Sequence, residues 1–314
     1  MTRKIGIIGV GHVGGAIAHS AVVQGVADDY VLIDTDVDHV EAEALDLTEA
    51  QPNLKHHANI TVNDWSALDD ADVVISSVGK IALQKTNPGT NSRFIEVPHN
   101  VKQVKSVAEH LRATKFHGVL IVITNPNDIM VTLYQKLTGY PQNKVIGTGT
   151  LLDTARMLNG VGQAFHLDAR SVSGYNLGEH GNSQFTAWSN VKILDHPIIP
   201  IAEREGVDLE DIEDTSRNNG HFLFQAKGYT NYAIAGAAIR LTETILSDSH
   251  SELPVSNLRP GHDVYLSYPA VVGREGILQQ ADLDLTDAEE AKLAESYKFV
   301  SDKYHDIVAH LDEY

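Results

Sequence analysis

The sequence predicts an α/β protein in which a doubly wound parallel sheet is followed by an α+β half with antiparallel strands. In the first half, short apolar runs rich in β-branched residues alternate with longer amphipathic segments. This alternation is typical of buried parallel strands joined by helices. In the second half, long helices and clustered strands replace it. We therefore place a domain boundary after residue 148, giving one domain over 1–148 and a second over 149–314.

The pattern of apolar residues predicts the individual elements. In the first half, strands are expected at 5–10, 30–34, 59–62, 72–78, 119–124 and 144–148, and helices at 12–26, 37–50, 94–116 and 129–138. In the second half, helices are expected at 151–165, 208–224 and 230–248, and strands at 171–177, 184–194, 253–257, 265–272 and 277–285. A last helix follows Thr286, where Glu289 three residues later has the spacing of a capping box.

Composition excludes several classes of function. The chain has 42 Asp and Glu residues against 24 Lys and Arg, a net charge of −18, which disfavours nucleic acid and anionic membranes as partners. It contains no cysteine, so disulfides, thiolate catalysis and cysteine-ligated metals are excluded. No apolar stretch approaches the roughly 20 residues of a membrane span. We expect a cytoplasmic protein.

A glycine-rich motif follows the first expected strand and begins the first helix. In GVGHVG, Gly9 permits a tight turn, Gly11 allows close approach of a diphosphate, and Gly14 allows the helix to pack on the strand. Val13 belongs to the same loop, and Asp34 ends the second strand roughly 20 residues further on, where a ribose acceptor belongs. The motif predicts a Rossmann dinucleotide site, and the carboxylate favours NAD over NADP. The alternative is a purely structural glycine turn.

Two short segments in the second half carry candidate catalytic residues. Reduction of a ketone needs a proton donor at the carbonyl oxygen, and His180 is suited to that near neutral pH. Asp153 is a candidate partner for its imidazole, and Arg156 has the fork that binds a carboxylate. Residues three apart share one helical face, so Asp153 and Arg156 alone equally suggest an intrahelical ion pair. No metal is expected, because no ligand spacing surrounds His180.

Five motifs together resemble the L-lactate/L-malate dehydrogenase family over nearly the whole chain. They are GVGHVG at 9–14, TNPND at 124–128, GTGTLLDTAR at 147–156, GEHGNS at 178–183 and KGYT at 227–230. Their order and spacing are those of the family. The resemblance implies an NAD-dependent L-2-hydroxyacid dehydrogenase that acts on a small 2-oxo or 2-hydroxy acid and forms a homodimer or homotetramer.

The resemblance also implies residue roles. His180 is then the general acid/base, Asp153 its partner and Arg156 the ligand of the substrate carboxylate. The remaining matches are Arg93, which polarises the carbonyl from a mobile lid; Asn125, near substrate and nicotinamide; Thr230, beside the substrate; and Ile234, against the nicotinamide ring.

The lid at 80–92 departs from the family pattern because it is several residues longer. It contains Ile81, Ala82 and Leu83 and lacks a second arginine, which favours substrates with a longer aliphatic side chain, as in the branch of the family that acts on L-2-hydroxyisocaproate. The insertion leaves the residue that sets specificity open among Leu83, Gln84 and Lys85. Since one methylene changes binding by about 1–3 kcal/mol, specificity should be broad.

Three alternatives stay open from the sequence. One is a lactate enzyme for pyruvate, with a malate enzyme less favoured. Another is a nucleotide-binding sensor that kept the fold and lost the chemistry, against which the complete set of matched residues argues. The third is an NAD-dependent glycosidase on a similar fold, which normally needs a metal and a cysteine ligand that this chain lacks.

Overall fold

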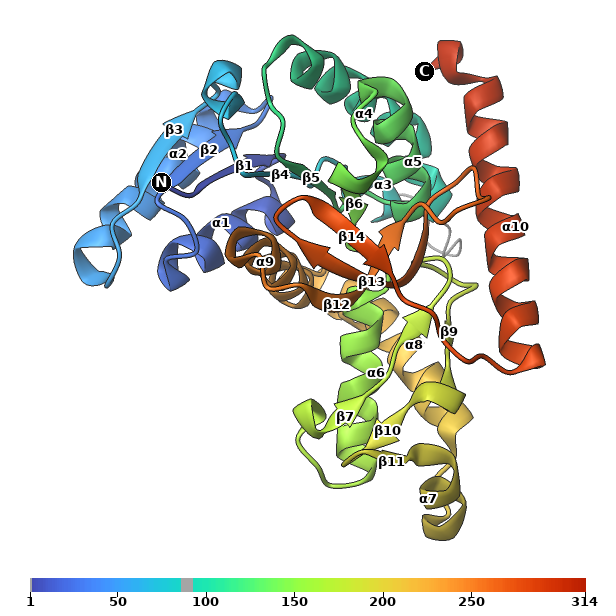
Figure 1. Cartoon of the computed structure of the whole chain (residues 1–314). Helices are drawn as coiled ribbons and strands as arrows, with labels where there is room; N and C mark the ends of the chain where they lie inside the picture. The colour runs from blue at the N-terminus through green and yellow to red at the C-terminus, as the bar shows by residue number, and fades with distance from the viewer. Residues whose placement is uncertain (1, 86–92) are drawn as a thin grey trace.

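A parallel sheet forms the first half of the protein. The structure is a computed structural model that describes residues 2–85 and 93–314. Its main sheet has the strand order β14-β13-β12-β6-β5-β4-β1-β2-β3 (Figure 1). The parallel strands are β1 (Lys4–Ile8), β2 (Asp29–Ile33), β3 (Asn59–Val62), β4 (Val73–Ser76), β5 (Val119–Val122) and β6 (Val145–Gly147). Because the order reverses between β1 and β4, the carboxyl ends of these two strands form a binding crevice. The predicted doubly wound fold is confirmed.

Three antiparallel strands from the second half extend the same sheet. They are β12 (Ser251–Asn257), β13 (Leu266–Gly273) and β14 (Gly276–Gln280). Ser256 of β12 pairs with Gly147 of β6, so the sheet continues across the expected boundary at residue 148. The division into two domains stays a prediction.

Helices cover both faces of the sheet. In chain order, the helices of the described residues, including α7 and α8 away from this sheet, are α1 (His12–Gln24), α2 (Val37–Ala50), α3 (Ala82–Lys85), α4 (Val97–Ala113), α5 (Asn127–Thr138), α6 (Leu151–Ala164), α7 (Ile198–Glu205), α8 (Leu209–Lys227), α9 (Tyr232–Ser247) and α10 (Asp287–Ala309). Short 3₁₀ turns connect several of them: η1 (Gln51–Asn53), η2 (Trp65–Leu68), η3 (Arg93–Glu96), η4 (Gln142–Lys144), η5 (Ala169–Ser171), η6 (Trp188–Asn190) and η7 (Leu311–Glu313). None of the helices within the described residues combines the length and apolar character that a bilayer crossing requires.

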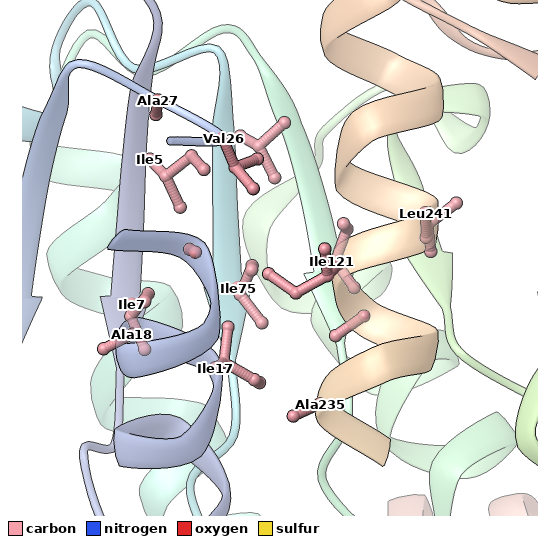
Figure 2. Packing of buried hydrophobic residues seen from close by; sticks show 14 of the residues in the cluster. Ile5, Ile7, Ile17, Ala18, Val26, Ala27, Ile75, Ile121, Ala235 and Leu241 are labelled. Carbon is pink, nitrogen blue, oxygen red and sulfur yellow. The ribbon is translucent and has the colours of Figure 1, made fainter. Parts of the chain in front are cut away.

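Both faces of the central strands of the sheet are buried, which explains why a strand such as β5 is apolar throughout rather than alternating. On one face, one apolar cluster includes Ile17 of α1, Ala235 and Leu241 of α9, Ile75 of β4 and Ile121 of β5 (Figure 2). On the other face, α4, α5 and α10 pack against the alternate side chains of the same strands, such as Val74 of β4 and Leu120 of β5. The core therefore joins α9 of the second half to α1 of the first.

Several expected elements in the second half differ from the structure. The long strands expected at 171–177 and 184–194 are short pieces: β7 (Val172–Ser173), β8 (Asn176–Leu177), β9 (Phe185–Thr186) and β10 (Lys192–Ile193), with β11 (His196–Pro197) beyond them. The first is interrupted at Gly174, whose φ is +140°, and the second by the turn η6. Helix α7 was not expected from the sequence. The helix expected from residue 94 begins at Val97, and the last strand ends at Gln280 instead of residue 285.

The expected capping box at the start of α10 is confirmed. Thr286 Oγ1 accepts from the Glu289 backbone N–H at 3.3 Å, and Glu289 Oε2 accepts from the Thr286 backbone N–H at 2.9 Å. We expect Thr286→Ala to lower the free energy of unfolding by about 1 kcal/mol, since it removes this cap. Urea denaturation measures the change. Thr215→Ala, an exposed position within α8, is the control, and an equal effect of the two substitutions would contradict the assignment.

Candidate functional site

One carboxylate joins the two candidate catalytic side chains. Asp153 lies in the first turn of α6, and Arg156 follows one turn later. Asp153 Oδ2 is 2.5 Å from Nδ1 of His180, and Asp153 Oδ1 accepts a 3.0 Å bond from Nη1 of Arg156. The side chains of Asp153, His180 and Arg156 are only 3%, 11% and 14% exposed. The intrahelical ion pair considered from the sequence is therefore present, and the same carboxylate also contacts the histidine.

This arrangement fixes how the imidazole can act. A carboxylate that accepts from Nδ1–H holds the ring in one orientation and directs proton exchange to Nε2. When the ring is protonated, Nε2 carries a proton that it can donate to an oxygen atom, and the carboxylate stabilises the positive charge. A nearby guanidinium can bind a substrate carboxylate with two hydrogen bonds. The three side chains therefore suit proton transfer to a small carboxylic acid.

The loop that carries His180 is fastened on both sides. Gly178, whose φ is +89°, follows β8 and exchanges two backbone hydrogen bonds with Ser267 of β13, at 3.0 and 3.2 Å. Within the loop, buried Glu179 accepts from the backbone N–H and the hydroxyl of Ser183, at 3.0 and 2.7 Å. These bonds hold the backbone of His180 independently of its side chain.

Asp128 is a site residue that the sequence reasoning missed. This carboxyl, in the first turn of α5, accepts the backbone N–H of His180 at 2.8 Å through Oδ2. Its Oδ1 accepts from the hydroxyls of Ser256 at 2.6 Å and Ser267 at 3.2 Å. Burial raises the pKa of Asp128 to about 6, although hydrogen bonds from Ser256 and His180 act in the opposite direction.

A signal for Asp128 was present in the sequence. The residue belongs to the TNPND motif and directly precedes the apolar run from Ile129 to Val131. A carboxylate in the first turn of a helix is favoured by the helix dipole. When the helix is buried, the carboxylate also needs hydrogen-bond donors from the protein. That position indicates a structural acceptor, but the sequence does not show which donor it faces.

The expected cofactor loop has the geometry of a diphosphate site. Gly9 has a φ of +86°, and a Cβ on Gly14 would lie 2.0 Å from the Gly9 carbonyl oxygen, so neither position tolerates a side chain. A Cβ on Gly11 would meet no described atom within 4 Å, which leaves space for a ligand. Val13 is half-buried in the first turn of α1, which has neither a side-chain cap nor an acidic residue among its first positions. An anion is favoured there.

Asp34 connects the cofactor loop to the end of β2. Its Oδ2 accepts the backbone N–H of Val10 at 2.7 Å, and its Oδ1 accepts that of Asp36 at 3.0 Å. Among the described residues, no cation lies within salt-bridge distance of this carboxylate, so its negative charge remains to oppose a 2′-phosphate. The second lone pair of each oxygen is available to a ribose hydroxyl.

A buried amide oxygen in the segment after β5 is placed to accept a hydrogen bond from a ligand. The carbonyl of Asn125 accepts from Asn100 Nδ2 at 2.7 Å, but the side-chain Oδ1 of Asn125 is buried and has no hydrogen-bond partner among the described residues. A buried acceptor left alone costs about 1–3 kcal/mol, so a bound donor such as a carboxamide would satisfy it. Together with the space at Gly11, this atom fits the binding of NAD.

The other expected site residues lie in three places. Thr230 is half-buried in the turn between α8 and α9, and Ile234 is buried in the core on α9. Leu83 lies half-buried on α3. Arg93 begins η3, but its side chain, those of Gln84 and Lys85, and residues 86–92 of the expected lid lie outside the described residues.

Comparison with known proteins identifies the family. Residues 3–147 match the lactate/malate dehydrogenase NAD-binding domain, and residues 150–310 match the lactate/malate dehydrogenase alpha/beta C-terminal domain. The chain belongs to the lactate/malate dehydrogenase family. It is therefore an oxidoreductase for small hydroxy or oxo acids, and its cofactor is NAD, as expected from the glycine motif.

Relatives within the lactate/malate dehydrogenase family cover almost the whole chain. L-lactate dehydrogenase 1 of Bifidobacterium longum is 35% identical over 95% of this chain and 96% of its own length. L-lactate dehydrogenase 1 of Lactobacillus acidophilus is 37% identical over 94% of this chain and 92% of its own. The minor L-lactate dehydrogenase of Enterococcus mundtii has a TM-score of 0.91 at 30% identity, over 98% of both chains. None of these names indicates specificity for hydroxyisocaproate.

The raised pKa of Asp128 predicts how the free energy of unfolding changes with pH. Its pKa is about 6 in the folded protein against an ordinary 3.8, so between these values the folded chain holds a proton that the unfolded chain releases. Stability contributed in this way is complete below about pH 4 and is lost as the pH rises through about 6. We expect the free energy of unfolding of the wild type, relative to Asp128→Asn, to fall over this window.

Urea denaturation at pH 4, 5, 6 and 7 measures this difference. Asp46→Asn, at an exposed carboxylate of α2, controls for the loss of one negative charge. A difference that is constant with pH, or that rises with it, would contradict the effect of burial on Asp128.

Proposed function

We propose that this chain is an NAD-dependent L-2-hydroxyacid dehydrogenase that reduces 2-oxo acids with aliphatic side chains. The observation that carries the proposal is the shared carboxylate of Asp153, which contacts His180 and Arg156 at once. A proton donor beside a cationic group that binds carboxylates matches the carbonyl group and the adjacent carboxylate of a 2-oxo acid. The family membership supports the same reaction class.

The roles of the residues follow from their chemistry. Arg156 binds the substrate carboxylate, and Nε2 of His180 gives its proton to the carbonyl oxygen while Asp153 stabilises the imidazolium. NAD, held by Gly9, Gly11, Val13, Gly14 and Asp34, supplies or accepts the hydride when bound.

Four further residues have roles carried over from the family. Asn125 offers its Oδ1, which has no hydrogen-bond partner among the described residues, to the nicotinamide or the substrate, and Thr230 lies beside the substrate. Ile234 supports the nicotinamide ring, and Arg93 polarises the carbonyl. We further propose a cytoplasmic homodimer or homotetramer.

The identity of the substrate has two candidates. The extended lid, which contains Ile81, Ala82 and Leu83, favours a branched substrate such as 2-oxoisocaproate. The relatives with the names quoted above are L-lactate dehydrogenases, which favours pyruvate instead. Since a methylene in an apolar pocket contributes about 1–3 kcal/mol, both acids should react, at different rates.

The role of His180 is tested by His180→Asn. We expect kcat for 2-oxo acid reduction to fall by about 10²- to 10⁴-fold, because the general acid is lost, while NADH binding measured by calorimetry changes little. His57→Asn removes an exposed histidine of the first half and is the control. Near-normal turnover of His180→Asn would refute the assignment, and an absence of NADH oxidation by the wild type with every 2-oxo acid would favour a nucleotide-binding sensor.

Substrate preference is tested with parallel initial rates of NADH oxidation. Pyruvate, 2-oxobutyrate, 2-oxoisocaproate, phenylpyruvate and oxaloacetate form the panel. We expect a higher kcat/KM for 2-oxoisocaproate than for pyruvate, since the apolar lid should accommodate the branched chain. A strong preference for pyruvate would make the lactate reaction the correct one.

A further inference from the structure

A pair of stacked rings connects the two halves of the expected active site. The imidazole of His12 and the ring of Tyr229 lie 3.8 Å apart between centroids, with an angle of 10° between their planes. His12 is the first residue of α1, directly after Gly11 in the glycine-rich loop. Tyr229 lies in the turn between α8 and α9, directly before Thr230. Neither side chain has a role in the chemistry described so far.

Tyr229 is also held from its own side of the molecule. The Lys227 ammonium lies 4.8 Å from the centroid of the Tyr229 ring and 3.9 Å from that of Tyr232. The same nitrogen donates to Asn231 Oδ1 at 2.5 Å. Cation–π contacts of this kind restrict an aromatic side chain. The turn after α8 therefore presents Tyr229 as a fixed surface against which His12 stacks.

The stack lies at the N-terminal ends of two helices that pack together. Further along the same two helices, Ile17 of α1 and Ala235 of α9 belong to one apolar core (Figure 2). The backbone N–H groups at the start of α1 are those that favour a diphosphate, and the start of α9 follows Thr230. A contact between His12 and Tyr229 therefore fixes the relative position of the dinucleotide loop and the loop that carries Thr230.

We infer that His12 and Tyr229 are positioning residues that couple cofactor binding in the first half to the substrate-binding loop of the second. Neither ring takes part in the chemistry. The stack acts through the backbone of the two loops, so that a diphosphate bound at α1 and a substrate bound beside Thr230 each favour the same arrangement. This inference rests on the proposed function, because it requires that NAD and a 2-oxo acid occupy these two loops.

A double-mutant cycle tests the coupling. NADH dissociation constants are measured by calorimetry for the wild type, His12→Ala, Tyr229→Ala and the double variant, and KM and kcat for pyruvate are measured in parallel. An aromatic pair contributes enough for each single substitution to weaken NADH binding by about 2- to 10-fold. We expect the double variant to bind NADH no more weakly than the single variant with the lower NADH affinity. We also expect KM for pyruvate to rise by a larger factor than kcat falls.

Two further variants separate positioning from a general structural effect. His12→Phe keeps a flat ring and should restore NADH affinity to within about 2-fold of the wild type. His19→Ala, at an exposed position of α1, should leave affinity and turnover unchanged. The thermal midpoints of His12→Ala and His12→Phe without cofactor should lie close to that of the wild type, because His12 is exposed.

The outcomes distinguish this inference from the proposed function. The coupling is refuted if the fold-losses of NADH affinity in the two alanine variants multiply in the double variant, or if neither variant loses affinity. It is also refuted if His12→Phe loses as much NADH affinity as His12→Ala. In each case the dehydrogenase activity stands. If the wild type neither binds NADH nor reduces any 2-oxo acid, the proposed function fails first, and the coupling fails with it.

Discussion

The candidate site depends on the carboxylate of Asp153, which contacts His180 with one oxygen and Arg156 with the other. Its burial makes both interactions stronger than they would be in water. A buried charge of this kind is tolerated only when its partners are in place, so His180 and Arg156 also stabilise the carboxylate that orients them. One side chain thereby sets the distance between the imidazole and the guanidinium that we propose as the substrate contacts.

The rest of the fold keeps this carboxylate next to its partners. α6, which carries Asp153, begins directly after β6, and β12 extends the same sheet on the far side of β6. The loop of His180 is tied to β13 through Ser267, and its backbone is tied to α5 through Asp128. The glycine-rich loop and the turn that carries Thr230 meet where α1 and α9 share a core. A sheet common to both halves therefore supports the whole site.

The sequence predicted the parts of the structure that have long periodic patterns or strict steric demands. The parallel strands, the glycine loop and the capping box belong to this group, because a Cβ at Gly14 or the loss of the capping side chain of Thr286 would be costly. The two-residue strands from β7 to β11 are too short to show alternation, so 171–177 and 184–194 were expected as single strands. Asp128 was missed because its partner is a backbone group 52 residues away, which no local pattern reveals.

The most direct test of the central claim is the steady-state kinetics of Asp153→Asn with NADH and a 2-oxo acid. An amide cannot stabilise the imidazolium of His180 and cannot pair with the charge of Arg156. If one carboxylate organises both groups, kcat should fall and KM for the 2-oxo acid should rise in the same variant, with NADH affinity unchanged. A change in kcat with KM unaltered, or the reverse, would contradict the shared role of Asp153.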